Sequence, residues 1–250
     1  MENFQDLDQY IGCHNFFVSW KTFHLTKSHF KDYINFIKSN PEFNFFMFND
    51  STQDKWMEEF IAIENPDIYE IYKGCVYAAT KSDIFRLLLL YRYGGIYSGI
   101  NIVYTRPLIS IFQSDKFVCS FEKNKYNLSS YSNHFPHKYR GFFAIQHTLM
   151  APSEHKLLKM CIDKIISNSH FYNNKKFEEI PSVLWDFSAP GMLTQVLNDY
   201  LESYGNKDIV FAGIGFYNSF RYATGHKYRY MFSPSYHGAK NSKVLKLKDN

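Results

Sequence analysis

The fold of this chain of 250 residues is decided by residues 78–104, which read AATKSDIFRLLLLYRYGGIYSGINIVY. Apolar side chains recur there at helical spacing, at Ile84, Leu87, Leu88 and Tyr91, as on the buried face of a helix. Two glycines follow, and glycine readily takes the positive φ that ends a helix. We therefore predict a buried helix over residues 79–93 and a strand over residues 96–104.

Strands and helices are expected to alternate along the rest of the chain. Short runs rich in Phe predict strands at residues 16–20 and 43–48, with a helix between them and another at 56–63. Further strands are expected at 117–121, 141–150 and 209–211, and further helices at 157–166 and 190–201. The tail from Lys240 is expected to be frayed. This order predicts one three-layer α/β domain over residues 1–250 with a mixed central sheet, residues 1–13 and 240–250 being peripheral.

Composition excludes several classes of protein. Apolar residues make up 45% and charged residues 21% of the chain, as in globular proteins. A formal net charge of +4 without a basic stripe argues against a nucleic-acid binder. The four cysteines form no CxxC pair, so no zinc cage is indicated. We find neither a signal peptide nor a membrane span in the sequence, and we expect a cytoplasmic protein.

Asp83 and Arg86 are the charged residues that need an explanation on the predicted helix. They lie three residues apart, so their side chains are neighbours on its surface. Leu89 and Leu90 make this helix apolar almost all round, and charges on a buried helix need partners. Two alternatives stay open: the two side chains pair for structural reasons, or they hold a ligand.

The strings that contain these residues, ATKSDIFR and GGIY, closely resemble the signature of glycosyltransferases that contain the DxD sugar-binding region. That family includes yeast outer-chain mannosyltransferases, bacterial capsule enzymes and, more distantly, clostridial glucosylating toxins. The resemblance implies a GT-A-like, Rossmann-like sandwich with extra helices. It also implies that Asp83 and Arg86 hold hydroxyls of the donor sugar, that Trp20 stacks on the nucleobase, and that Tyr97 and Gly99 lie at the nucleotide.

The chain departs from the family where the acidic metal motif is expected, because Gly99-Ile100-Asn101 stands in place of DxD. A divalent ion on a pyrophosphate prefers anionic oxygen ligands, so affinity for Mg or Mn should fall. Asn101 and, as a weaker candidate, His237 remain possible metal ligands. Two alternatives stay open: the pyrophosphate itself holds the ion, or basic groups neutralise the diphosphate. The candidates for these basic groups, by composition only, are His147, Arg221, Lys227, His237 and Lys240.

Two functions follow from the resemblance and from this departure. The first is transfer of a hexose from a UDP- or GDP-sugar to a glycan or protein acceptor, with retention at the anomeric carbon as in most of the family. The second is a catalytically inactive relative that binds a sugar nucleotide or a protein partner. The degenerate motif is the reason to keep the second. Neither hypothesis assigns a catalytic residue, and neither requires nucleic acid or a membrane span.

Overall fold

A mixed sheet of seven strands forms the centre of the protein, in a computed structural model that describes residues 4–12, 14–25, 27–123, 133–222 and 239–247. Its strand order is β2-β1-β3-β7-β5-β6, with β9 paired to β5. The strands are β1 (Asn15–Ser19), β2 (Asn44–Phe48), β3 (Gly95–Gly99), β5 (Phe117–Lys123), β6 (Phe142–Ala144), β7 (Thr148–Ala151) and β9 (Ile209–Ile214). β1 runs parallel to β2 and β3, whereas β7 is antiparallel to β3. The predicted α/β fold with a mixed sheet is confirmed.

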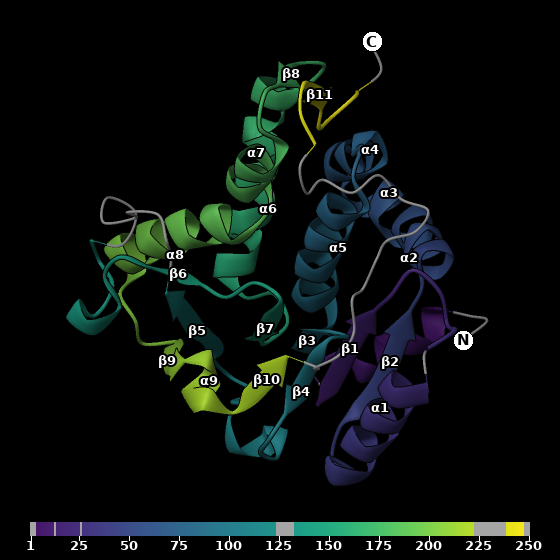
Figure 1. Ribbon diagram of the computed structural model, residues 1–250, viewed down its shortest axis with the longest axis vertical. Helices are drawn as coiled ribbons and strands as arrows, with labels where there is room; N and C mark the ends of the chain where they lie inside the picture. Colours follow the sequence, from purple (N-terminus) through teal and green to yellow (C-terminus); the bar gives the residue numbers. More distant parts are fainter. Residues whose placement is uncertain (1–3, 13, 26, 124–132, 223–238, 248–250) are drawn as a thin grey trace.

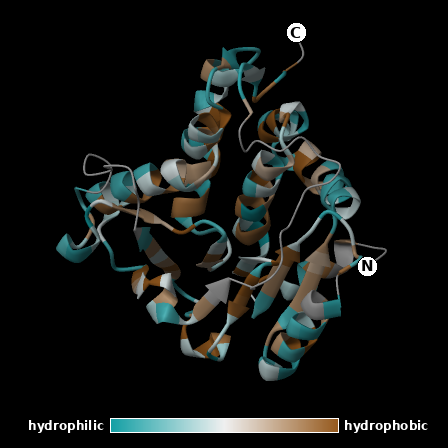
Figure 2. Ribbon diagram, in the orientation of Figure 1, coloured by the Kyte–Doolittle hydropathy of each residue, from teal (hydrophilic) through white to brown (hydrophobic). Residues whose placement is uncertain are grey.

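Helices cover both faces of this sheet, which gives three layers (Figure 1). Side chains alternate along β1: Phe16 packs against Phe36 of helix α1 (Lys27–Ser39), while Phe17 packs against Tyr93 of helix α5 (Ala78–Tyr93) on the opposite face. Figure 2 shows hydrophobic residues concentrated in the central strands, whereas much of α1 is hydrophilic. The period of two in a strand thus feeds two separate cores. The other helices are α2 (Asp50–Trp56), α3 (Ala62–Glu64), α4 (Pro66–Gly74), α6 (Lys156–Tyr172), α7 (Ile180–Phe187), α8 (Pro190–Tyr204) and α9 (Gly215–Asn218).

Helix α5 ends as predicted, at two glycines that no other residue could replace without a clash. Gly94 has φ 68°, and a Cβ there would lie 2.6 Å from the amide nitrogen of Ser153. Gly95 has φ 104°, and a Cβ would lie 2.4 Å from the carbonyl oxygen of Asn15. Both positions need positive φ and close backbone approach. The glycines therefore bring β3 directly beside β1 at the end of a buried helix.

Three parts of the fold differ from the sequence prediction. The strand expected over residues 96–104 is broken at residues 100–101 into β3 and β4 (Ile102–Tyr104), and the strand expected over residues 141–150 is broken into β6 and β7. Helices α4 and α7 were not predicted. Each follows a polar residue and carries Pro in its first turn, where Pro fits because its missing N–H is not needed. Pro66 thus begins a helix as well as interrupting one.

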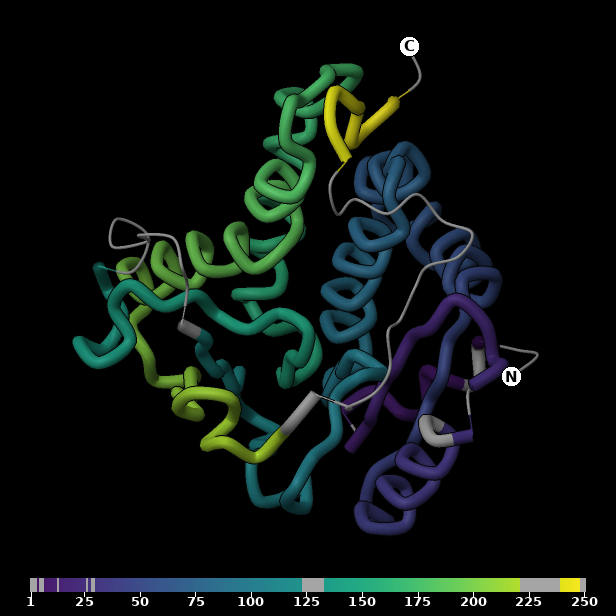
Figure 3. Tube along the Cα trace, viewed as in Figure 1, coloured from purple at the N-terminus to yellow at the C-terminus, as the bar shows by residue number. Residues whose placement is uncertain are grey.

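The C-terminal segment is ordered by backbone pairing rather than frayed. β11 (Ser242–Lys243) pairs with β8 (Lys176–Phe177), and Leu245 is fully buried. The amide of Lys246 donates to the carbonyl of Gly74 over 2.9 Å. Figure 3 shows this segment beside α4 and the α6–α7 connection. The expected fraying from Lys240 is therefore wrong for the described residues through Leu247, because Val244 and Leu245 are buried in the hydrophobic core.

Candidate functional site

A pocket of about 510 Å³ opens where the parallel strands β1 and β3 end. β2 and β3 lie on opposite sides of β1, so the chain order of the strands reverses direction across the sheet at β1. Ligands of open α/β sheets bind outside the carboxyl ends of strands at such a point, and the volume suits a small molecule. The lining residues are Ser19, Trp20, Ala79, Ser82, Asp83, Arg86, Tyr97, Gly99, Ile100, Asn101, Glu122, Phe143, Gln146, His147, Trp185, Ala189 and Pro190.

Asp83 and Arg86 form an ion pair in one wall of the pocket. Nη2 of Arg86 lies 3.0 Å from Oδ1 of Asp83, and each side chain is 13% exposed. Burial raises the pKa of Asp83 to about 6, although the Arg86 guanidinium and a hydrogen bond from Ser188 oppose this rise. The predicted pairing on a buried helix is thus confirmed. The raised pKa shows that the pair is under-solvated, as at ligand sites.

Backbone and side-chain hydrogen bonds fix the Asp83–Arg86 pair in a ring. Nη1 of Arg86 donates to the carbonyl of Gln146 over 2.9 Å, and Oγ of Ser188 donates to Oδ2 of Asp83 over 3.3 Å. Nε2 of Gln146 closes the ring by donating to the carbonyl of Ser188 over 2.6 Å. Oε1 of Gln146 is buried and accepts no hydrogen bond from the described residues. An acceptor of this kind calls for a donor, and a ligand hydroxyl is one.

Tyr97 and Trp20 lie on the β1–β3 side of the same pocket. The Arg86 guanidinium lies 5.0 Å from the centre of the Tyr97 ring, and the Tyr97 hydroxyl is 2.5 Å from Oγ of Ser19. Trp20 follows directly at the end of β1 and is partly exposed, with Nζ of Lys21 5.7 Å from its ring centre. Trp20 lines the pocket and is partly exposed, so it is a pocket aromatic rather than a core aromatic.

The turn at residues 99–101 forms the floor of the pocket. The amide of Gly99 donates to the carbonyl of His147 over 2.8 Å. Gly99 does not have a positive φ. A Cβ added to it would lie 2.9 Å from the side-chain oxygen of Asn101, and the next nearest atom, the carbonyl oxygen of His147, would be 3.6 Å away. The backbone thus does not require glycine at this position. An aspartate there would need only a small movement of the Asn101 side chain.

Glu122 and His147 form a second acid–base pair across the pocket from α5. Nε2 of His147 lies 3.5 Å from Oε1 of Glu122, and Nδ1 lies 3.2 Å from Oγ1 of Thr148. Tyr104 donates to Ser98 over 2.9 Å and lies 3.1 Å from Thr148, while Oγ of Ser98 donates to the carbonyl of Gly99 over 3.4 Å.

This chain of hydrogen bonds has one consistent direction. Because the Tyr104 proton goes to Ser98, Thr148 donates to Tyr104, and we assign the donated proton on His147 to Nδ1. Nε2 of His147 then faces Glu122. Burial raises the pKa of Tyr104 to about 12, so this hydroxyl keeps its proton. The sequence offered a signal for His147 but none for Glu122, which lies far from the motif in the chain.

Four other residues were candidates for the site. His237 and Lys227 fall outside the described residues. Lys240 is exposed and does not line the pocket. Arg221 belongs to β10 (Phe220–Tyr222), which pairs with β4. The structure therefore brings the candidates Trp20, Asp83, Arg86, Tyr97, Gly99, Asn101 and His147 together around one pocket, and adds Gln146 and Glu122 to its lining.

Comparison with known proteins places this geometry in context. Residues 27–118 match the family described as "Glycosyltransferase sugar-binding region containing DXD motif". This segment of the chain is similar to that region of these glycosyltransferases. The matched segment includes the Asp83–Arg86 pair, the two glycines and the turn at residues 99–101. The resemblance predicted from the sequence is confirmed.

Individual glycosyltransferases share this region at low identity. The initiation-specific alpha-1,6-mannosyltransferase of Candida albicans is 22% identical over 208 residues, 76% of this chain and 53% of the relative. The inositol phosphoceramide mannosyltransferase 3 of Schizosaccharomyces pombe is 28% identical over 90 residues, 36% of this chain and 24% of the relative. The chain thus spans about half the length of the first relative and about a quarter of the second.

A solved glycosyltransferase shares the fold. The PaToxG glycosyltransferase superposes with a TM-score of 0.54 at 18% identity, over 81% of this chain and 76% of that one. The architecture is therefore that of a GT-A glycosyltransferase domain. None of the helices in the described part of the chain has both the length and the hydropathy needed to cross a bilayer. The cytoplasmic location stays a prediction.

The divalent ion that the glycosyltransferase family implies does not fit the residues of this pocket. Gly99 has no side chain to act as a ligand, and the Asn101 side chain offers one neutral amide oxygen. Among the described residues, no group of three or more His, Cys, Asp or Glu side chains could hold a metal. The internal segments outside the described residues, 124–132 and 223–238, contain no Asp or Glu. The anionic oxygens that Mg or Mn prefers are thus missing from the motif position.

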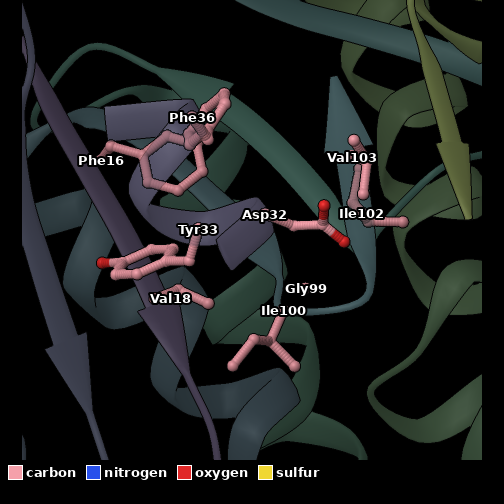
Figure 4. A pocket seen from close by; sticks show the side chains of 9 residues that line it. All are labelled: Phe16, Val18, Asp32, Tyr33, Phe36, Gly99, Ile100, Ile102 and Val103. Carbon is pink, nitrogen blue, oxygen red and sulfur yellow. The ribbon is translucent and has the colours of Figure 1, made fainter. Parts of the chain in front are cut away.

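A second, much smaller cavity lies on the other side of the turn at residues 99–101. It measures about 30 Å³ and is lined by side chains of β1, α1 and β4, among which Asp32 alone is charged (Figure 4). This volume is close to that of one water molecule, so a sugar cannot enter. Burial raises the pKa of Tyr33 in this cavity to about 12. The large pocket on the α5 side is therefore the candidate active site of this glycosyltransferase-like chain.

Proposed function

We propose that this chain transfers a hexose from a UDP- or GDP-sugar to a glycan or protein acceptor. The observation that carries the proposal is the ring formed by Asp83, Arg86, Gln146 and Ser188 in the wall of a 510 Å³ pocket. Its carboxylate and guanidinium are held rigidly and shielded from water, which strengthens directed hydrogen bonds to a ligand. The names of the two relatives favour mannose as the hexose.

Each side chain of the pocket has a role in this proposal. Asp83 accepts hydrogen bonds from donor-sugar hydroxyls, and Arg86 donates to another of them. The unmet Oε1 of Gln146 accepts a further hydroxyl after a small local adjustment. Trp20 stacks on the nucleobase beyond the end of β1, and Tyr97 supports Arg86 from below. Sugar and base thus occupy opposite ends of the pocket, and the diphosphate lies over the turn between them.

The proposal is tested with a panel of UDP- and GDP-sugars, assayed for donor hydrolysis and for transfer in the presence of Mn²⁺ and, separately, of EDTA. We expect turnover with at least one donor, and a fall of about a hundredfold on Arg86→Lys, since the loss of a charged hydrogen bond costs about 3 kcal/mol. Lys keeps the charge but loses the planar donor pair. A control, Lys38→Met, changes a cation of α1 outside the pocket and should leave turnover unchanged.

The competing hypothesis is an inactive relative that binds a sugar nucleotide or a partner. Donor-induced thermal stabilisation without turnover of any donor would favour it. The absence of both stabilisation and turnover for every donor would contradict the proposed glycosyltransferase. Retention at the anomeric carbon stays a prediction, which product analysis of the active donor would test.

A further inference from the structure

The ionisable side chains that line the pocket neutralise one another. Four of the lining residues have acidic or basic side chains: Asp83, Arg86, Glu122 and His147. Each acid lies beside a base, with Arg86 3.0 Å from Asp83 and His147 3.5 Å from Glu122. A divalent cation is attracted by carboxylates whose charge is not already compensated. The pocket therefore offers little net attraction for Mg²⁺ or Mn²⁺.

The turn at residues 99–101, over which we place the diphosphate, has no charged side chain, and lack of room for a Cβ at Gly99 is not the reason. Gly99 does not have a positive φ, and the contact that an added Cβ would tighten is with the movable end of the Asn101 side chain. The backbone therefore accommodates a Cβ at this position, yet no carboxylate is present. The absence of the two acids is a chemical feature of the site and is not imposed by the backbone.

Asn101 can contact a diphosphate in a way that an aspartate cannot. An aspartate only accepts hydrogen bonds, whereas the Asn101 amide has two N–H donors, and Asn101 lines the pocket. Donors of this kind bind phosphate oxygens directly, whereas two aspartates would repel them unless a cation lay between.

We propose that this pocket binds the diphosphate of its ligand by direct hydrogen bonds from Asn101, without a divalent cation. The inference rests on the proposed function, because it concerns the same nucleotide site. It sets this chain apart from relatives that carry the acidic motif. The cation and the two carboxylates are replaced together by neutral donors.

The test compares nucleotide affinity with and without metal in three versions of the full chain. Calorimetric titrations with UDP and with GDP are run in Mn²⁺ and in EDTA. For the unmodified chain we expect the Kd of the nucleotide that binds to differ by less than about twofold between the two conditions. For Gly99→Asp/Asn101→Asp we expect weaker binding in EDTA and at least about tenfold tighter binding when Mn²⁺ is added.

The matched control is Gly99→Asn with Asn101 kept, which adds nearly the same volume as aspartate without its charge. It should remain insensitive to Mn²⁺. Because Asn101→Asp alone is isosteric, it serves if the double variant does not fold, and urea denaturation without nucleotide reports folding in each case. A smaller gain with Mn²⁺, above about threefold, is expected for this single change.

Other outcomes separate this inference from the proposed function. Nucleotide binding by the unmodified chain that strengthens about tenfold or more with Mn²⁺ would overturn metal independence while supporting the glycosyltransferase. Loss of that gain in Glu122→Gln would then place the ion at Glu122. Failure of UDP and GDP to bind under either condition, in any version, would overturn both proposals.

Discussion

The two acid–base pairs of the pocket differ in how the fold holds them. Asp83 and Arg86 lie on one helix, 3.0 Å apart, and each side chain is 13% exposed. Glu122 and His147 come from β5 and from the loop before β7, lie 3.5 Å apart, and are 29% and 28% exposed. The first pair is local and largely dry. The second pair depends on the register of the sheet and remains partly in contact with solvent.

This difference teaches which interactions of the pocket are structural as well as functional. Removing one partner of a buried pair leaves a charge in a poorly solvated place, which costs several kcal/mol. Exposed pairs contribute little, since water screens them. We therefore expect the Asp83–Arg86 pair to couple ligand binding to stability, whereas the Glu122–His147 pair affects ligand binding with little effect on stability.

The largest expected effect is on the stability of an Arg86→Met variant. Methionine keeps most of the apolar volume but removes the ion pair and the hydrogen bond to the carbonyl of Gln146. We expect the free energy of unfolding to fall by about 3 kcal/mol at pH 7.5, because Asp83 is left buried without its base. Urea denaturation followed by circular dichroism measures it.

The double variant Asp83→Asn/Arg86→Met is the control for this effect. It removes both charges, so no uncompensated carboxylate remains, and we expect it to recover more than half of the lost stability. A double variant as unstable as Arg86→Met would show that the loss comes from packing. The comparison between the two pairs would then lose its electrostatic basis.

A smaller effect is expected from the titration of Asp83. Burial raises its pKa from 3.8 to about 6 in the folded chain, so folding favours the protonated carboxyl. Its contribution to stability is fully present below pH 4 and is lost as the pH rises through 6. The total is about 3 kcal/mol at most, because a tenfold change in proton affinity corresponds to about 1.4 kcal/mol.

The measurement compares the unmodified chain with Asp83→Asn in urea at pH 4.5 and at pH 7.5. The variant has no proton to lose, so the unmodified chain should lose stability relative to it as the pH rises. An unchanged difference between the two chains at the two pH values would contradict the raised pKa. The comparison would then place Asp83 in a better solvated site than its burial indicates.

Local features of the fold were predictable because their causes lie within a few residues. The apolar spacing in α5 and the glycines at 94 and 95 are read directly from the sequence, and the structure confirms both. The break between β3 and β4 was not predicted, because the β-branched and aromatic residues on both sides of Gly99 and Asn101 favour a strand. Tertiary contacts accompany that break, because β3 pairs with β1 and β7 in the central sheet, whereas β4 pairs with β10 in a separate two-stranded sheet.

The residues of the candidate site likewise differ in whether the sequence alone points to them. Asp83 and Arg86 could be predicted from a spacing of three on a buried helix, and Trp20, Tyr97 and Gly99 from the resemblance. Glu122 could not, because nothing near it in the sequence shows that β5 brings it beside His147. The ordered tail was missed for the same reason, as its partner Gly74 is distant in sequence. Contacts between residues that are far apart in the chain leave no signal in the local sequence pattern.

The smallest expected effect concerns the Glu122–His147 pair and sharpens the comparison most directly. A double-mutant cycle with Glu122→Gln, His147→Gln and the double variant isolates the coupling between the two side chains. Urea denaturation at pH 7.5 should give a coupling energy of less than about 1 kcal/mol, because both groups keep contact with water. The same cycle on Asp83→Asn and Arg86→Met should give a coupling energy of more than about 2 kcal/mol, because that pair is largely buried.

Equal coupling energies in the two cycles would contradict the distinction between the two pairs. In that case the exposure of a quarter to a third of each side chain would matter less than the hydrogen bonds that orient it. Thr148→Val, which removes the partner of Nδ1 of His147, should then lower the coupling of the second pair.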